Sequence, residues 1–119
     1  MDVVSLAEKF DRIDEYWSPA IVGELNGQHV KLAKLRGEFD WHHHAVDELF
    51  LVIDGELTIE LRDEPDAALS AGEFLVVPAG VDHRPVAEEE VRVLLFEPAG
   101  TRNTGNVESE RTVEAPDRL

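Results

Sequence analysis

The sequence predicts an all-β protein with one short N-terminal α-helix, folded as a sandwich or a barrel. From residue 20 onward, the chain consists of short apolar stretches separated by turn residues. Asn26-Gly27 and Asp54-Gly55 are residue pairs typical of tight hairpin turns. Helical spacing of apolar residues is confined to the first 19 residues. Many short strands with regular turns indicate a sandwich or a barrel.

The N-terminal helix is predicted over residues 5–17. Ser5 and Glu8 fit a capping box at its start. The helix should end before Ser18-Pro19, because a residue that precedes proline disfavours the helical conformation. Its apolar stripe is most simply a packing surface. The stripe consists of Leu6, Phe10, Ile13 and Trp17.

Seven strands are predicted after the helix, and several of them are apolar on both faces. Their ranges are Ile21–Leu25, Val30–Leu35, Phe39–His44, Glu48–Ile53, Leu57–Leu61, Phe74–Val77 and Val91–Phe96. A small isolated barrel usually exposes its outer face to water. Since the helix can cover only part of that face, we expect a second copy of the chain to cover the rest, as a homodimer.

These elements divide the chain into three parts. Residues 1–19 hold the helix, which should pack on the barrel. Residues 20–106 form the β-barrel, in which Glu88-Glu89-Glu90 is interpreted as a solvated loop. Residues 107–119 are a polar tail that we expect to be poorly ordered, because it has little apolar surface to bury.

Length and composition exclude several classes of function. A chain of 119 residues is most simply one domain. It has no apolar run of the ~20 residues that span a membrane, and no secretory signal, so we expect a cytoplasmic protein. With 11 basic and 26 acidic residues, its net charge of −15 would repel nucleic acid. The absence of cysteine excludes disulfides, thiolate nucleophiles and zinc-thiolate sites.

A cluster of histidines is the strongest functional pattern. Residues 41–48 read Trp-His-His-His-Ala-Val-Asp-Glu. On a strand, His42 and His44 would share one face while His43 lies on the other. With the Glu48 carboxylate and the imidazole of His83 from a distant strand, they would form a site that suits a first-row divalent ion. The alternative is a solvated patch of histidines without a ligand.

The spacing of these residues resembles the first motif of the cupins. That motif has a glycine, a His-x-His pair, three or four residues, a glutamate, six residues and a second glycine. Here His42, His44, Glu48 and Gly55 match in order. Gly37 departs from the pattern, because four residues rather than five separate it from His42.

The second cupin motif is matched as well, and the two together extend the resemblance over about residues 21–98. Its glycine, proline, glycine and histidine correspond to Gly72, Pro78, Gly80 and His83, while Ala87 stands where an asparagine is usual. The resemblance implies an antiparallel jelly-roll β-barrel. It also implies that His42, His44, Glu48 and His83 bind one divalent metal ion per chain, whether iron, manganese, nickel, copper or zinc.

Three functions remain open on this basis. The first is a small mononuclear metal-dependent enzyme, dioxygenase-like or isomerase-like, that acts on a small organic molecule, with Glu48 alternating between ligand and base. The second is a metal-containing module that binds or senses a small ligand without turnover. The third is a purely structural barrel. Phe50, Val52 and Phe74 are candidates either for the lining of a pocket or for ordinary core.

Overall fold

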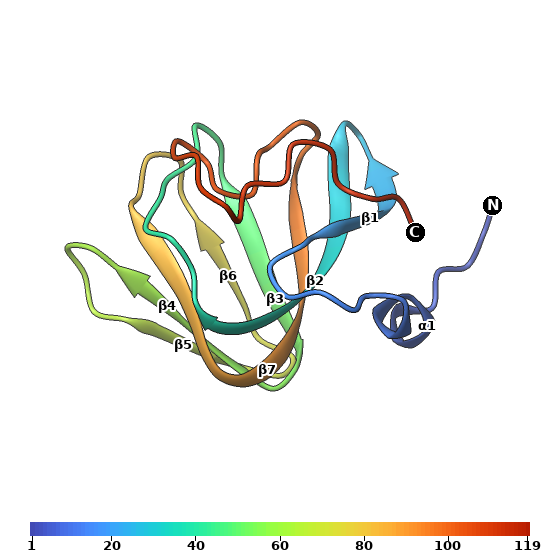
Figure 1. Cartoon of the computed structure of the whole chain (residues 1–119), viewed down its shortest axis with the longest axis horizontal. Coiled ribbons are helices and arrows are strands. Elements are labelled where there is room, and N and C mark those ends of the chain that lie inside the picture. The colour runs from blue at the N-terminus through green and yellow to red at the C-terminus, as the bar shows by residue number, and fades with distance from the viewer.

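The computed structural model describes all 119 residues and contains one α-helix, α1 (Leu6–Asp11), and seven strands. Every pairing between the strands is antiparallel. Figure 1 shows the helix at one end of a strongly curved β-structure. The predicted all-β class with a short N-terminal helix is therefore confirmed. The strands are β1 (Ala20–Leu25), β2 (Gln28–Glu38), β3 (Glu48–Asp54), β4 (Glu56–Leu61), β5 (Ala67–Ser70), β6 (Phe74–Val77) and β7 (His83–Pro98).

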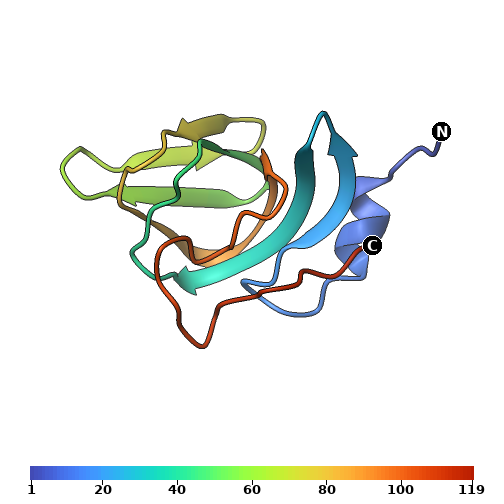
Figure 2. The same cartoon turned by 90° about the horizontal axis from the view of Figure 1, so that it is seen from above.

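The sixteen-residue strand β7 organises the sheet. Its C-terminal half lies between β2 and β3, while its N-terminal half pairs with β4. The resulting order is β1-β2-β7-β3-β6. Strand β4 pairs with β7 outside this order, and β5 pairs with the other edge of β4. Because β7 belongs to both groups of strands, they curve around a common interior (Figures 1 and 2). The sheet is not closed into a complete barrel, since β1, β5 and β6 are edge strands.

The two faces of the sheet have different cores. Twelve buried apolar residues fill the interior, including Phe50 and Val93. A smaller cluster lies on the other face of β2, where Phe10 and Ile13 pack against Leu32. Helix α1 thus covers one end of the outer face, as its apolar stripe predicted. The helix has only six residues, and the structure has no helix that meets the length and apolarity needed to cross a membrane.

The helix is shorter than predicted. Ser5 caps it as expected, since the Ser5 hydroxyl accepts a hydrogen bond from the backbone N–H of Glu8. Residues 12–17, however, leave the helix and approach β2. The Lys34 side chain donates to the carbonyl of Ile13 at 2.7 Å, and the backbone N–H of Trp17 donates to the carbonyl of Lys34 at 3.0 Å. These contacts with β2 replace the bonds of a longer helix.

Two predicted strand boundaries are wrong. Residues 39–44 form no strand apart from one bridge between His42 and His83. Conversely, Glu88–Glu90 is part of β7 and not a loop. The register between β2 and β7 shifts between Leu35 and Gly37, opposite this acidic segment. The three carboxylates are exposed to solvent while the backbone continues as a strand, so a run of charged residues did not by itself mark a loop.

The C-terminal segment also differs from the expected disordered tail. The backbone N–H of Leu119 donates to the carbonyl of Ile21, and that of Ile21 donates to the carbonyl of Asp117. Leu119 packs against the cluster beneath α1. Figures 1 and 2 show the segment returning from the end of β7 along the strands to β1. Its few apolar atoms suffice because backbone hydrogen bonds tie it to β1 and side-chain hydrogen bonds tie it to Asp40.

Candidate metal centre

Three short segments bring the four predicted ligands together. His42 and His44 lie in the irregular segment 39–47, while Glu48 begins β3 and His83 begins β7. A pair of backbone hydrogen bonds joins His42 to His83, and the N–H of Gly80 donates to the carbonyl of His44 at 2.8 Å. The prediction placed both histidines on one face of a strand. They do share a side, but tertiary hydrogen bonds rather than strand alternation place them there.

The four side chains form a compact and buried group. One donor atom from each of them lies within 4.8 Å of all the others. The Nε2 atoms of His44 and His83 are 3.4 Å and 3.5 Å from Oε1 of Glu48. No side chain of the four is more than 5% exposed.

Hydrogen bonds orient two of the imidazole rings. Nδ1 of His42 donates to the carbonyl of Asp40 at 2.8 Å, and Nδ1 of His83 donates to the carbonyl of Val81 at 2.9 Å. A carbonyl oxygen only accepts, so the proton of each neutral ring is on Nδ1. The Nε2 atom therefore keeps a free lone pair, which is the form in which imidazole binds a metal.

The surroundings of the site disfavour protonation of His42 and of Glu48. Burial, together with the nearby His83, lowers the pKa of His42 to about 4. Burial alone would raise the pKa of the Glu48 carboxyl, but the adjacent imidazoles of His44 and His83 bring it below its ordinary range. A neutral imidazole at His42 and an ionised carboxylate at Glu48 are the protonation states that metal binding requires.

The structure also tests whether these residues fit a metal ion. Nε2 of His44, Nε2 of His83 and Oε1 of Glu48 are buried and have no hydrogen-bond partner. Buried polar atoms are nearly always paired, because an unpaired one costs about 1–3 kcal/mol. A cation that bound all of them would account for three such atoms beside one another. The donor set therefore fits a divalent ion, and the third histidine of the run does not belong to it. His43 points instead to Asp82, with Nδ1 2.9 Å from its carboxylate.

One buried acidic residue beside the centre was not predicted. Glu97 is 1% exposed, and its carboxylate lies 3.0 Å from the buried ammonium of Lys31. Burial, and then the neighbouring Glu48 carboxylate, raise the pKa of Glu97 to about 9. The pattern of β7 contained a signal for it, because Glu97 has the same parity as the inward-facing Val93 and Leu95.

Of the three residues predicted as candidates for the lining of a pocket, only Phe50 lines a cavity at this centre. Phe50 lies in the wall of a cavity that also includes His42, Glu48 and Glu97. Val52 belongs to the main core. Phe74 is 64% exposed on the outer face of β6, so it lines no pocket at this centre.

Known proteins resemble this chain in sequence and in fold. The family model of the cupin domain matches residues 28–97. A cupin-2 domain protein from Shewanella frigidimarina has 43% sequence identity and a TM-score of 0.78, over 81% of this chain and 94% of that one.

Two curated proteins match over shorter stretches. The Bacillus subtilis protein YdbB is 47% identical over 64 residues, which are 53% of this chain and 57% of YdbB. The acireductone dioxygenase of Yarrowia lipolytica is 33% identical over 70 residues, which are 56% of this chain and 40% of the enzyme. The chain thus spans about half the length of the curated relatives that it matches.

Proposed function

We propose that this chain, which belongs to the cupin family, is a small mononuclear metal-dependent enzyme of dioxygenase type that acts on a small organic molecule. The observation that carries the proposal is the group of unpartnered donor atoms on His44, Glu48 and His83. A structural barrel would not be expected to keep three buried polar atoms unpaired.

The proposed ligands are His42, His44, Glu48 and His83, and they would hold one divalent ion per chain. Their nitrogen and oxygen atoms suit iron, manganese, nickel, copper and zinc. A redox-active ion bound there would supply Lewis-acid or dioxygen chemistry to an organic molecule beside it.

The protein's own residues prepare this chemistry. The bonds from His42 to Asp40 and from His83 to Val81 hold two rings with Nε2 toward the group. Glu48 is ionised at neutral pH, so it can accept a proton from the bound molecule as well as hold the ion. The apolar walls of the adjoining cavity limit the access of water.

A dioxygenase is favoured over an isomerase of phosphorylated sugars. The matching regions of several acireductone dioxygenases support the first. A phosphate group needs free cationic side chains. No arginine or lysine lines the cavity, and the nearby Lys31 is already paired with Glu97.

The test is reconstitution of the purified, untagged protein with Fe²⁺ under anaerobic conditions. We expect about one metal ion per chain by elemental analysis, and oxygen consumption with members of a panel of enols and diketones. Failure to bind stoichiometric metal would refute the proposal. Bound metal with ligand-induced thermal stabilisation but no turnover would favour the non-catalytic binding module. The matched variants are His83→Ala, which should lose the metal, and His43→Ala, which should keep it.

We also propose that the working form is a homodimer, on the basis of the outer face of β3, β6 and β7. Three of its residues, Leu49, Leu51 and Phe74, alternate with inward-facing neighbours and are not buried. The register places Phe74 beside Leu51, and Leu51 beside Leu94. A contiguous apolar patch on three adjacent strands is typical of an interface. The cluster beneath α1 reaches Leu94 at the edge of this patch, but it leaves Phe74, which is 64% exposed, uncovered.

Light scattering coupled to size exclusion tests the dimer. We expect twice the mass of the 13.3 kDa chain at low micromolar concentration. The variant Phe74→Glu should be monomeric, because it would place a charge in an apolar interface. A monomeric wild-type protein would refute the dimer and leave the metal centre unaffected.

A further inference from the structure

Three buried polar residues form a row across the inner face of three adjacent strands. Lys31 lies on β2, Glu97 on β7 and Glu48 on β3. Leu49 of β3 pairs with Phe96 of β7. The same register, continued by one residue, sets Glu48 opposite Glu97, and residues opposite each other on antiparallel strands point to the same face. None of the three polar residues is more than 4% exposed.

Hydrogen bonds run along this row and end at a proposed metal ligand. Nζ of Lys31 donates to Oε1 of Glu97 at 3.0 Å and to the carbonyl of Thr101 at 3.2 Å. A further side-chain hydrogen bond joins the carboxyls of Glu97 and Glu48. Oε2 of Glu97 has no other partner. Glu97 thus binds the ammonium group through one oxygen and is left with the second oxygen for Glu48.

The hydrogen bond between the two carboxyls needs a proton. An ionised carboxylate only accepts hydrogen bonds, so one of the two groups must be protonated and must donate. Glu48 has to be ionised to bind a cation, which leaves the proton on Glu97. The directions of the two pKa shifts agree. Burial, and then the Glu48 carboxylate, raise the pKa of Glu97 to about 9, whereas the pKa of Glu48 lies below its ordinary range.

A structural role for the pair of Lys31 and Glu97 does not account for the whole row. A buried ion pair adds little stability compared with apolar residues of the same size. Such a pair would also not need a third polar group on the next strand. With one proton between the two carboxyls, the row carries the positive charge of Lys31 and a single negative charge. That negative charge is on Glu48, the residue proposed to bind the ion.

We infer that Glu97, anchored by Lys31, is a positioning residue that donates a hydrogen bond to Glu48 and so holds this carboxylate toward the proposed metal ion. The inference rests on the proposed function, because Glu48 acts in it as a ligand. A carboxylate has two oxygens, so Glu48 can accept this bond and still bind the ion. Hydrogen bonds to a ligand fix its orientation, and their loss typically lowers metal affinity about tenfold to hundredfold.

The experiment measures the Zn²⁺ affinity of the wild-type protein and of two variants by competition with a chelator. Zinc is chosen because it has no redox chemistry. In the first variant, Glu97→Gln, the side-chain amide can still donate to Glu48, and its carbonyl can still accept from Lys31. Glu97→Gln should therefore bind zinc as tightly as the wild type.

The second variant is the double substitution Lys31→Met and Glu97→Leu, which removes the donor and leaves no buried charge of the pair behind. All four proposed ligands remain, but Glu48 loses its hydrogen bond. We expect about a tenfold to hundredfold loss of Zn²⁺ affinity. An unchanged affinity would overturn the inference. A loss in Glu97→Gln as large as in the double variant would overturn it too, because a negative charge on Glu97 would then be what the ion requires.

Infrared spectroscopy of the zinc-loaded protein at neutral pH tests the inference even where the double variant does not fold. The wild type should show the C=O stretching band of a buried, protonated carboxyl group, and Glu97→Gln should lack this band. If the band is absent from the wild type, or is the same in the variant, Glu97 is not the donor and the inference is overturned.

The same measurements separate this inference from the proposed function. Wild-type protein that takes up no stoichiometric zinc would refute the metal centre, and the inference with it. Stoichiometric zinc that all three proteins bind with equal affinity would refute only the role of Glu97.

Discussion

The four donors of the candidate centre come from two regions that are held in different ways. Glu48 and His83 begin strands β3 and β7, where the hydrogen-bond ladder of the sheet fixes their backbone. His42 and His44 lie in segment 39–47, which is irregular apart from the bridge at His42. One half of the centre therefore depends on the sheet, and the other half depends on contacts from elsewhere in the chain.

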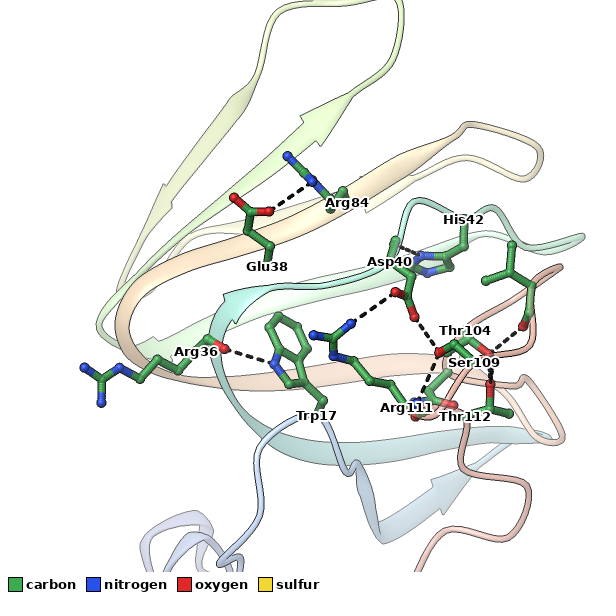
Figure 3. A network of polar contacts seen from close by, with 12 residues as sticks. Trp17, Arg36, Glu38, Asp40, His42, Arg84, Thr104, Ser109, Arg111 and Thr112 are labelled. Carbon is green, nitrogen blue, oxygen red and sulfur yellow. Dashed lines mark hydrogen bonds and ion pairs between the residues drawn. The ribbon is translucent and has the colours of Figure 1, made fainter.

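Some of those contacts come from the C-terminal segment, and the others come from residues 79–85. Figure 3 shows Ser109 and Arg111 converging on Asp40, whose carbonyl also accepts the bond from His42. The distances to the Asp40 carboxylate are 2.6 Å and 3.1 Å. The side chain of Asn106 accepts a bond from the backbone N–H of His43. A polar segment distant in sequence thus holds the loop that carries two of the proposed ligands.

The largest effect on this loop should come from Gly105→Ala. A Cβ atom at residue 105 would collide with the carbonyl of His43 and lie 3.1 Å from the ring of His42. Overpacking of this kind costs typically 1–3 kcal/mol. We expect a fall in the free energy of unfolding of that size and at least about a tenfold loss of Zn²⁺ affinity, measured by denaturation and by competition with a chelator.

Gly100→Ala is the matched control for this change. Gly100 lies in the same segment and also has a positive φ, but no atom lies within 4 Å of a Cβ built there. It should lose some stability through backbone strain and keep its metal affinity. Equal losses of affinity in the two variants would show that the loop is not held at Gly105.

A smaller effect is expected for Asp40→Ala. The substitution removes the carboxylate that binds Ser109 and Arg111 but keeps the carbonyl that binds His42. We expect a loss of about 1 kcal/mol in stability and up to about tenfold in Zn²⁺ affinity. The exposed Asp63 has no side-chain hydrogen bond or ion pair, so Asp63→Ala should change neither. Unchanged affinity in Asp40→Ala would mean that the bonds from Ser109 and Arg111 do not help to position the donors.

A separate effect, which needs no metal and no change in the loop, concerns the pH dependence of the metal-free protein, and it tests the residues that the sheet positions. The raised pKa of Glu97 means that the native state keeps a proton that the unfolded chain releases. This contribution is complete below pH 4.5 and is lost as pH rises toward 9. The lowered pKa of His42 acts in the opposite direction between about pH 4 and 6.5. The contributions of Glu97 and His42 to stability offset each other up to about pH 6.5. Above pH 6.5, only the contribution of Glu97 still changes with pH.

Stability should therefore fall as pH rises from 6.5 toward 9, by at most about 1.4 kcal/mol per pH unit. Denaturation with urea across this range measures the slope. Glu97→Gln has no titrating group at this position and should remove the slope. A slope that is the same in the variant would assign it to a different group.

Pattern and resemblance predicted most of the framework. The hairpin turns at Asn26-Gly27 and Asp54-Gly55 lie where expected, between β1 and β2 and between β3 and β4. The capping role of Ser5 could be predicted from the sequence, because it depends on residues only three positions apart. The short strand β5 was not predicted, because Ala67–Ser70 has neither a clear alternation of apolar and polar residues nor the bulky side chains that favour strands.

The remaining errors share a physical reason. Helix α1 ends early because residues 13–17 bond to β2, and Glu88–Glu90 stays in a strand because its neighbours pair with β2 and β4. Residues 39–44 were predicted as a strand because alternation would place His42 and His44 on one side, whereas in the structure a tertiary bridge to His83 places them there. In each case, a partner distant in sequence outweighed the local pattern.

By itself, the sequence determined the class of fold and the hairpins, because these depend on residue type and short-range spacing, and its resemblance to the two cupin motifs pointed to the four grouped donors. Only the tertiary structure decided how the donors are held, which charges share their interior, and that the C-terminal segment binds the loop. The physical reason is that a hydrogen bond or a buried charge depends on which atoms meet in space. For Asp40 and Arg111, or Glu97 and Lys31, that meeting joins residues about 70 positions apart.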